Sequence, residues 1–206
     1  NIEVEYAEQK GIHCLCAPEG NKTAVAEHAL GMLLNLFRNI NKANAEVRKG
    51  QWLREENRGI ELQGKTIGII GYGNMGSAFA QCLSGFGVTI LAYDKYKSNF
   101  GNDCVKESVL NELFAETDIL SIHLPYTTET HYYVDQPFLQ QFKKNIYLIN
   151  TARGQCLNTT DLVKNMESGK VLGACLDVLE YEGISFEKLD SEEIPSPLQY
   201  LFKSNK

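Results

Sequence analysis

Six residues from Gly71 to Gly76 have the types and spacing that could bind a pyrophosphate group. They read Gly71-Tyr-Gly-Asn-Met-Gly76, fit the pattern G-x-G-x-x-G, and lie between a predicted buried strand and a predicted helix. Gly71 permits a tight turn, Gly73 lets the backbone approach the phosphates without a Cβ in the way, and Gly76 lets the helix pack against the strand. We expect the backbone amides of Asn74 and Met75 to point at the phosphates, assisted by the helix dipole.

An acidic residue that could hold a ribose follows at Asp94. It stands at the end of the next predicted strand, 18 residues after Gly76. A carboxylate at this place hydrogen-bonds the hydroxyl groups of an adenosine ribose. Because it would repel a 2′-phosphate, we expect NAD rather than NADP as the cofactor.

Polar residues also stand at the ends of the later strands, where ligands bind in an open parallel sheet. The segments His123-Leu-Pro125 and Asn150-Thr-Ala-Arg-Gly154 and the residue Asp177 each follow a predicted strand. Arg153 could hold a substrate carboxylate in a two-pronged hydrogen bond and keep its charge at any working pH, or it could pair with a local carboxylate. Asp177 could hold the amide group of a nicotinamide, or it could cap a turn.

These residues are positioned by a regular alternation of strands and helices. Apolar strands followed by helices predict a parallel sheet that is covered on both faces. The predicted fold class is therefore α/β, a Rossmann-type doubly wound parallel sheet. The predicted strands are Lys65–Ile70, Val88–Tyr93, Asp118–His123, Ile146–Asn150 and Val171–Leu176, and the predicted helices between them are Ser77–Gly85, Ser108–Glu116, Tyr133–Phe142 and Thr160–Ser168.

Two further elements are predicted before the glycine-rich loop. The segment Ile12–Cys16 reads as a short buried strand, and apolar residues at spacings of three and four predict one helix over residues 23–48. A helix of about 25 residues would be about 38 Å long, which is long for a small domain. It could pack against a second subunit, or it could be an ordinary core helix.

Composition excludes several classes of function. The chain has 206 residues and a net charge of −6, and its Lys and Arg residues are scattered, so we expect no nucleic-acid partner. No apolar run reaches the roughly 18 residues that span a bilayer, so we expect no membrane segment. Cysteine spacing predicts buried free thiols in a reducing, cytoplasmic compartment and no metal site. The cysteines are Cys14, Cys16, Cys82, Cys104, Cys156 and Cys175.

Taken together, these residues resemble the D-2-hydroxyacid dehydrogenase family, and within it the branch that is similar to phosphoglycerate dehydrogenase. The matching motifs fall in the family's order and at its usual spacing, and the resemblance covers nearly the whole chain, from Asn1 to about Pro197. They are Asn21-x-x-x-Val25-Ala-Glu27-His28, Gly71-x-Gly73-x-x-Gly76, His123-Leu-Pro125, Asn150-Thr-Ala-Arg-Gly154 and Leu176-Asp-Val178.

The resemblance implies a catalytic arginine, glutamate and histidine. Arg153 matches the arginine, which binds and polarises a 2-oxo acid. Glu182 matches the glutamate that hydrogen-bonds the histidine and raises its pKa. Glu180 is close enough to compete for that role, and either carboxylate could instead belong to a solvated acidic turn.

The resemblance also implies the cofactor and the partners. The cofactor is NAD, the substrate is a small 2-hydroxy or 2-oxo acid such as 3-phosphoglycerate or a related acid, and the helix over residues 23–48 matches one that builds a homodimer in relatives. The implied activity is hydride transfer from the CH–OH group of a D-2-hydroxy acid to NAD. The implied cofactor-binding residues at the later strand ends are His123, Pro125, Thr130, Thr151, Ala152 and Asp177.

Two features depart from the family pattern. The family's acid/base histidine follows a Thr-Pro or similar pair some way after the glutamate, whereas no histidine follows His131 here. Almost all of the substrate domain that precedes this region in the family is also missing. We therefore expect residues 1–17 to be a remnant of a substrate-domain end or hinge and residues 18–206 to be an NAD-binding domain truncated near its C-terminal end. Such a chain would bind NAD without turnover.

Two other classes of protein use similar loops. An NAD(H)-sensing regulator or co-repressor could share this fold, since fold and cofactor site do not decide function. Arg153 and Glu182 argue against a pure sensor, which has no need of them. A methyltransferase also combines a glycine-rich loop with an acidic residue, but the Gly76 spacing and Arg153 argue against it.

Overall fold

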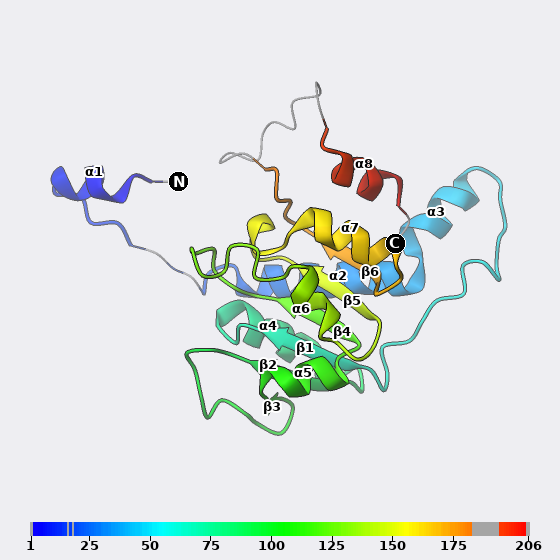
Figure 1. Cartoon of the computed structure of the whole chain (residues 1–206), viewed down its shortest axis with the longest axis horizontal. Coiled ribbons are helices and arrows are strands. Elements are labelled where there is room, and N and C mark those ends of the chain that lie inside the picture. The colour runs from blue at the N-terminus through cyan, green and yellow to red at the C-terminus, as the bar shows by residue number, and fades with distance from the viewer. Residues whose placement is uncertain (1, 16, 18, 183–193, 205–206) are drawn as a thin grey trace.

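A six-stranded parallel sheet forms the centre of the molecule, with helices on both of its faces (Figure 1). The computed structural model describes residues 2–15, 17, 19–182 and 194–204. The strand order β3-β2-β1-β4-β5-β6 confirms the predicted doubly wound α/β fold. The strands are β1 (Thr66–Ile70), β2 (Thr89–Tyr93), β3 (Lys106–Glu107), β4 (Ile119–Ile122), β5 (Ile146–Asn150) and β6 (Val171–Leu176).

Side chains along each strand alternate between two apolar clusters, one on each face of the sheet. In β1, Ile67 and Ile69 belong to one cluster and Ile70 belongs to the other. Because both faces are buried, the strands are almost wholly apolar, which is why their sequence pattern identified them. The first face is covered by α2 (Lys22–Arg38) and α4 (Asn74–Cys82), and the second by α5 (Leu110–Glu116), α6 (Gln136–Gln140) and α7 (Thr159–Glu167), with α8 (Ser196–Lys203) packed on α7.

The chain reverses its direction of winding between β1 and β4, which are neighbours in the centre of the sheet. The connections from β1 and from β4 leave toward opposite edges, so a crevice opens beyond the carboxyl ends of these two strands. The glycine-rich loop follows β1 and the segment from His123 follows β4. The fold therefore brings the first two predicted parts of the site to one place.

Several elements differ from their predicted bounds. Helix α4 begins at Asn74 rather than at Ser77, and α6 is short because Asp135 caps its start and Pro137 stands in its first turn. The short β3 and the helices α1 (Val4–Gln9) and α8 were not predicted. β3 has exposed side chains and α1 buries one residue, so neither carries an apolar pattern.

The prediction of one helix over residues 23–48 is wrong. The structure has two helices, α2 and α3 (Ile40–Arg48), separated by Asn39, whose φ of 52° is left-handed. Asparagine tolerates this conformation better than most residues, and it ends a helix by turning the chain. The apolar spacing continues across the break, so periodicity alone did not reveal it.

The predicted strand Ile12–Cys16 is also wrong over residues 12–15, which form no strand, while Cys16 lies outside the described residues. Ile12 is 58% exposed and Leu15 is 96% exposed. This segment runs apart from the sheet (Figure 1), so its apolar residues have no neighbouring strand to pair with.

The cysteines follow the prediction only in part. Cys156 and Cys175 are buried, and burial raises the pKa of the Cys175 thiol to about 12. Cys104 is exposed, and Cys14 and Cys82 are half-buried. Among the described helices, none is both long and apolar enough to cross a membrane.

Candidate functional site

The three glycines of the loop meet three different surroundings. Gly71 has a φ of +90°, and a Cβ there would overlap the carbonyl of His123. A Cβ at Gly76 would overlap the carbonyl of Gly71, so this glycine allows α4 to pack closely on the loop. A Cβ at Gly73 would meet no atom within 4 Å. Gly73 therefore borders open space, as expected of a residue over which a phosphate passes.

The start of α4 supplies backbone amides to this open space. Gly73 is the N-cap, and the first intrahelical hydrogen bond runs from the Ser77 amide to the Gly73 carbonyl at 3.0 Å. The amides of Asn74, Met75 and Gly76 precede that bond and lie in the turn where helices leave their donors without intrahelical partners. Together with the positive end of the helix dipole, they suit an anion.

Asp94 ties the end of β2 to the glycine-rich loop. Its Oδ2 accepts a hydrogen bond from the Tyr72 amide at 2.8 Å, and its Oδ1 accepts bonds from the amides of Tyr96 at 2.9 Å and Lys97 at 3.0 Å. The carboxylate is half-buried at the rim of a pocket. The Asp94 carboxylate is thus held in place by three backbone amides.

That pocket has a volume of about 170 Å³ and lies between the loop, the end of β2 and the segment after β4. An ion pair between Lys95 and Glu129 joins two sides of its lining, and the Tyr96 hydroxyl donates to Glu129 Oε2 at 2.7 Å. Sequence reasoning missed these residues because the two charges are 34 positions apart and only the fold unites them. Six predicted cofactor-binding residues line the pocket, namely Gly71, Gly73, Asp94, His123, Pro125 and Thr130.

His123 is held as a neutral ring at the bottom of this region. Its Nε2 lies 2.9 Å from Ser121 Oγ, and its ring centroid is 5.5 Å from that of Phe79. Burial lowers the pKa of His123 to about 4, so the imidazole is uncharged near pH 7. Its Nδ1 is buried and has no hydrogen-bond partner within the described part of the chain.

Thr130 closes the loop that follows His123. Its hydroxyl donates to the Pro125 carbonyl at 2.6 Å and accepts a hydrogen bond from the Thr127 amide at 2.8 Å. The loop is therefore a self-contained turn, and it carries Pro125 and Thr130 into the pocket lining.

The segment after β5 is shaped by Asn150. Its side-chain amide donates to the Arg153 carbonyl at 3.1 Å, and its Oδ1 accepts from the Ala152 amide at 3.0 Å. Within this turn the Thr151 hydroxyl is buried and lacks a partner among the described residues. Arg153 is exposed, with Nη1 donating to the Ala152 carbonyl at 2.6 Å, so its guanidinium can turn to a ligand.

Asp177 lies beside the same turn, at the end of β6. Its amide donates to the Asn150 carbonyl at 3.0 Å. Its Oδ1 lies 3.0 Å from Nε2 of His28, which comes from α2. Sequence reasoning gave His28 no role, because nothing local links residue 28 to residue 177.

The structure separates the two candidate glutamates. Glu180 is engaged on both oxygens: Oε1 accepts from the Tyr132 hydroxyl at 2.5 Å and Oε2 accepts from the Thr159 amide at 2.8 Å. Glu182 lies two residues further on and is half-buried. Both oxygens of Glu180 are therefore engaged within the chain, and the assignment of the catalytic role to Glu182 stays a prediction.

These parts fit a dinucleotide. Open space over Gly73, the backbone amides of the first turn of α4 and a pocket beside Asp94 suit a pyrophosphate and an adenosine. Two buried polar atoms without partners among the described residues, His123 Nδ1 and Thr151 Oγ1, stand just beyond β4 and β5. A ligand that lies along the carboxyl edge of the sheet would meet each of these features in turn.

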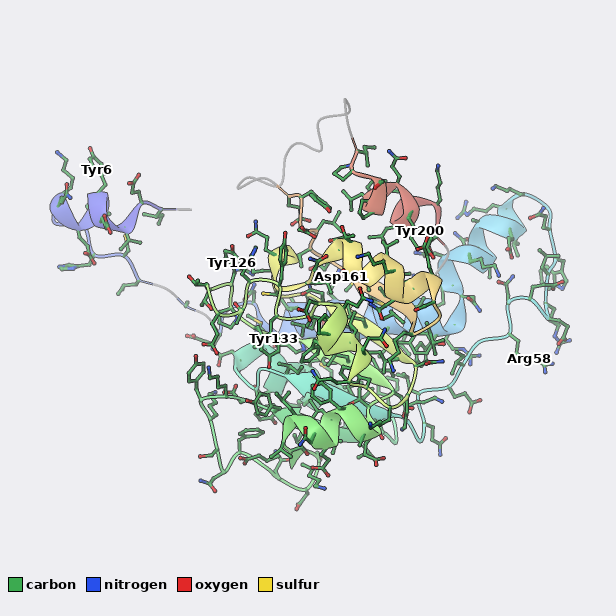
Figure 2. All side chains as sticks on the ribbon, viewed as in Figure 1. Tyr6, Arg58, Tyr126, Tyr133, Asp161 and Tyr200 are labelled. Atoms are coloured by element: carbon green, nitrogen blue, oxygen red, sulfur yellow. The ribbon has the colours of Figure 1, made fainter. Side chains whose placement is uncertain are left out.

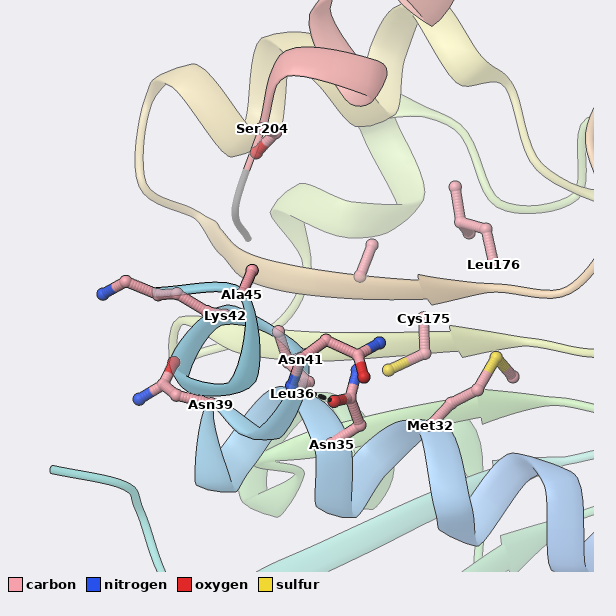
Figure 3. Close-up of a pocket in the computed structure, with 11 residues that line it drawn as sticks. Met32, Asn35, Leu36, Asn39, Asn41, Lys42, Ala45, Cys175, Leu176 and Ser204 are labelled. Atoms are coloured by element: carbon pink, nitrogen blue, oxygen red, sulfur yellow. Dashed lines mark hydrogen bonds between the residues drawn. The ribbon is translucent and has the colours of Figure 1, made fainter. Parts of the chain in front are cut away.

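A second hollow lies elsewhere in the molecule (Figure 3). It has a volume of about 480 Å³ and lies between α2, α3, β6 and the end of α8. None of the predicted site residues lines it. The residues that line it include Met32, Asn35, Asn39, Lys42, Cys175 and Ser204.

Comparison with known proteins gives a consistent result. Residues 30–199 match the model of the D-isomer specific 2-hydroxyacid dehydrogenase family, NAD binding domain. A hydroxypyruvate reductase of Thermotoga maritima is 38% identical over 183 residues, covering 88% of this chain and 59% of that protein. A D-3-phosphoglycerate dehydrogenase of Methanocaldococcus jannaschii is 36% identical over 187 residues, covering 88% of this chain and 35% of that protein.

Solved structures agree with the curated relatives. The D-lactate dehydrogenase of Aquifex aeolicus, complexed with NAD and lactic acid, superposes with a TM-score of 0.83 at 32% identity. The match covers 99% of this chain and 63% of that one. The chain thus spans from about a third to three-fifths of the length of these relatives.

Proposed function

Because the chain belongs to the D-isomer-specific 2-hydroxyacid dehydrogenases, we propose that it is the NAD-binding part of an enzyme acting on the CH–OH group of a D-2-hydroxy acid. The observation that carries this proposal is the continuous edge formed by the glycine-rich loop, Asp94 and the partnerless buried atoms of His123 and Thr151. The proposed substrate is 3-phosphoglycerate or a related hydroxy acid, in line with the names of the relatives.

In this proposal different residues of the chain bind different parts of the cofactor. The amides of Asn74 and Met75 hold the pyrophosphate above Gly73, and Asp94 accepts hydrogen bonds from the adenosine ribose. When bound, NAD supplies the acceptor for the hydride that leaves the hydroxy acid. Thr151 and Asp177 orient the nicotinamide end of the cofactor. Ala152 follows Thr151 in the chain and precedes Arg153, the arginine that binds the substrate.

The substrate side of the site depends on two charged residues. Arg153 binds the substrate carboxylate and polarises the 2-oxo group. Its side chain can turn toward the substrate because Arg153 is exposed. Glu182 hydrogen-bonds an acid/base histidine and raises the pKa of that histidine. No histidine follows His131 in these 206 residues, so the proposal assigns the proton transfer to none of them.

We propose that residues 1–17 are the end of a substrate domain or its hinge, and that the NAD-binding domain occupies residues 18–206. The position of α1 away from the sheet supports this division (Figure 1). In this proposal a substrate domain positions the substrate and excludes water. We therefore expect these 206 residues by themselves to bind NAD but not to turn over 2-oxo acids.

We also propose that the chain forms a homodimer and is cytoplasmic. The surface of α3 and the segment after it carries exposed apolar side chains, which mark protein interfaces when they cluster. Free thiols among the described cysteines suit a reducing compartment. The exposed apolar residues are Ile40, Val47, Trp52, Leu53 and Ile60.

Titration of the purified chain with NADH and with NADPH, followed by nicotinamide fluorescence, tests the proposed cofactor. We expect NADH to bind at least about tenfold more tightly than NADPH, because the Asp94 carboxylate repels a 2′-phosphate. The variant Asp94→Asn should lose about tenfold or more of its NADH affinity, the value of a hydrogen bond to a charged group. Asp103→Asn, on a nearby exposed loop, is the matched control.

The variants must keep the fold for this comparison, because Asp94 also holds three backbone amides. Circular dichroism of each variant provides that check. Equal affinity for NADH and NADPH, or no binding of either by a folded chain, would contradict the proposed cofactor. Reduction of 2-oxo acids by the chain at enzymatic rates would contradict the proposed lack of turnover.

A further inference from the structure

Tyr132 has a backbone conformation that its residue type disfavours. Its φ is 50°, in the left-handed region that few residues other than glycine and asparagine adopt. Its amide donates to the Gln155 carbonyl at 2.8 Å, and its hydroxyl donates to Glu180 Oε1 at 2.5 Å. Strain of this kind persists only where the surroundings hold the residue in place.

The backbone around Tyr132 joins the cofactor side of the site to the Arg153 turn. Thr130, two residues earlier, lines the pocket beside Asp94. Two residues later, Val134 forms a parallel bridge with Leu157, and the Val134 amide donates to the Cys156 carbonyl at 3.0 Å. Residues 132–134 therefore pair with the backbone that follows Arg153.

The side chain of Tyr132 reaches a third part, the segment that leads to Glu182. Glu180, its partner, also accepts the Thr159 amide at 2.8 Å. A Cβ at Gly154 would overlap the backbone of Leu179 and Glu180, so this segment lies directly on the turn after Arg153. The Glu182 amide in turn donates to the Leu179 carbonyl at 3.2 Å.

We propose that Tyr132 is a positioning residue: through Glu180 it holds the Glu182 segment on the Arg153 turn and couples that segment to the cofactor-binding loop that carries Thr130. The roles of Arg153 and Glu182 in this inference rest on the proposed function. The hydrogen bond between Tyr132 and Glu180 does not depend on that function. The hydroxyl is a donor throughout the neutral pH range, since its hydrogen bond to Glu180 raises the pKa of Tyr132 to about 12.

Hydrogen–deuterium exchange of the 206-residue chain tests the proposal with the variant Tyr132→Phe. This change removes one hydroxyl and leaves the Glu180–Thr159 bond in place. We expect amides of residues 179–182 to exchange about tenfold faster in Tyr132→Phe, because the segment loses its bond to the cofactor-binding loop. Tyr147→Phe, which removes the hydroxyl of another half-buried tyrosine away from this segment, should leave that exchange unchanged.

Two further readouts separate positioning from a general loss of stability. In Glu180→Gln the side-chain Oε1 can accept from the Thr159 amide while Nε2 donates to the Tyr132 hydroxyl oxygen, so most of the protection should be retained, whereas Glu180→Ala should lose it. Saturating NADH should slow exchange of residues 179–182 in the unsubstituted chain and should do so much less in Tyr132→Phe, while the NADH affinity changes by less than about threefold.

The outcomes are distinguishable. Unchanged exchange of residues 179–182 in Tyr132→Phe would overturn the positioning role, and so would equal loss of protection in Glu180→Gln and Glu180→Ala. An NADH effect of equal size in Tyr132→Phe would overturn the coupling. Failure of the unsubstituted chain to bind NADH would count against the proposed function, and the comparison without cofactor would still decide the positioning role.

Discussion

At the residue scale, His123 shows how burial sets the chemical state of a site residue. Only one ring nitrogen has a partner among the described residues, Ser121 Oγ at 2.9 Å from Nε2. Burial disfavours the charged imidazolium and lowers the pKa of His123 to about 4. The residue therefore does not act as a charged group near pH 7.

This lowered pKa predicts a dependence of stability on pH. The unfolded histidine has a pKa of about 6.5, so it is protonated below that pH. In the folded chain His123 stays neutral down to about pH 4, so between these two pH values unfolding takes up a proton. Stability contributed by the neutral ring is thus present above pH 6.5 and is lost as the pH falls toward 4. We expect His123 to lower the free energy of unfolding by about 2 kcal/mol between pH 7.5 and pH 5.

Urea unfolding of the chain and of His123→Gln at the two pH values measures this effect. The variant should lose most of the difference, whereas His13→Gln, which removes an exposed histidine, should keep it. The same pH dependence in the chain and in His123→Gln would contradict the prediction.

At the element scale, the junction of β1 and α4 predicts opposite results for two similar substitutions. Gly76→Ala places a methyl group against the Gly71 carbonyl, so α4 must shift, and we expect a loss of about 1–3 kcal/mol in stability. Gly73→Ala places a methyl group in open space, so stability should change by no more than about 0.5 kcal/mol. NADH affinity should nevertheless fall about tenfold or more in Gly73→Ala, because the methyl group occupies the path of the phosphates.

Denaturant unfolding and NADH titration together check this pair. Gly85→Ala is the control, because a Cβ there also meets no atom within 4 Å and Gly85 is remote from the loop. Full NADH affinity in Gly73→Ala would contradict the placement of the phosphates over this glycine.

The helices and strands that could be predicted from the sequence are those with local signals. The five longer strands of the sheet and the glycine turn between β1 and α4 were placed correctly because their signals are local: apolar runs in the strands and a fixed glycine spacing in the turn. The break at Asn39 was missed because the apolar spacing of α2 continues into α3, while the turn depends on one left-handed residue. The Lys95–Glu129 and His28–Asp177 pairs were missed because only the folded sheet brings their members together.

At the scale of the whole molecule, two segments extend from the body that surrounds the sheet. Figure 2 shows Tyr6 on α1 and Arg58 on the segment after α3 at opposite ends of the view. Trp52, on that second extension, is 80% exposed. Exposed tryptophans are enriched at the centres of protein interfaces.

Sedimentation of the chain tests the homodimer that we propose. We expect a dimer at micromolar concentration and an increase of about tenfold or more in the dissociation constant for Trp52→Asp. Val109→Asp is the control, since Val109 is 65% exposed at the start of α5 and lies on neither extension. A chain that sediments as a monomer at tens of micromolar would contradict the proposal.

The packing of α2 has a consequence for how the chain is made. α2 is complete at Arg38, yet it packs on β6, which begins at Val171, 171 − 38 = 133 residues later. The Phe37 ring contacts Tyr147 on β5, and Leu36 lies against Gly173 on β6. At the ribosome's pace of about 5–20 residues per second, these partners emerge roughly 7–27 s after the helix. During that interval α4, which emerges much earlier, can cover one side of α2, but the side that packs on β5 and β6 stays exposed, so a chaperone that binds apolar surfaces would meet this part of α2 while the sheet is still incomplete.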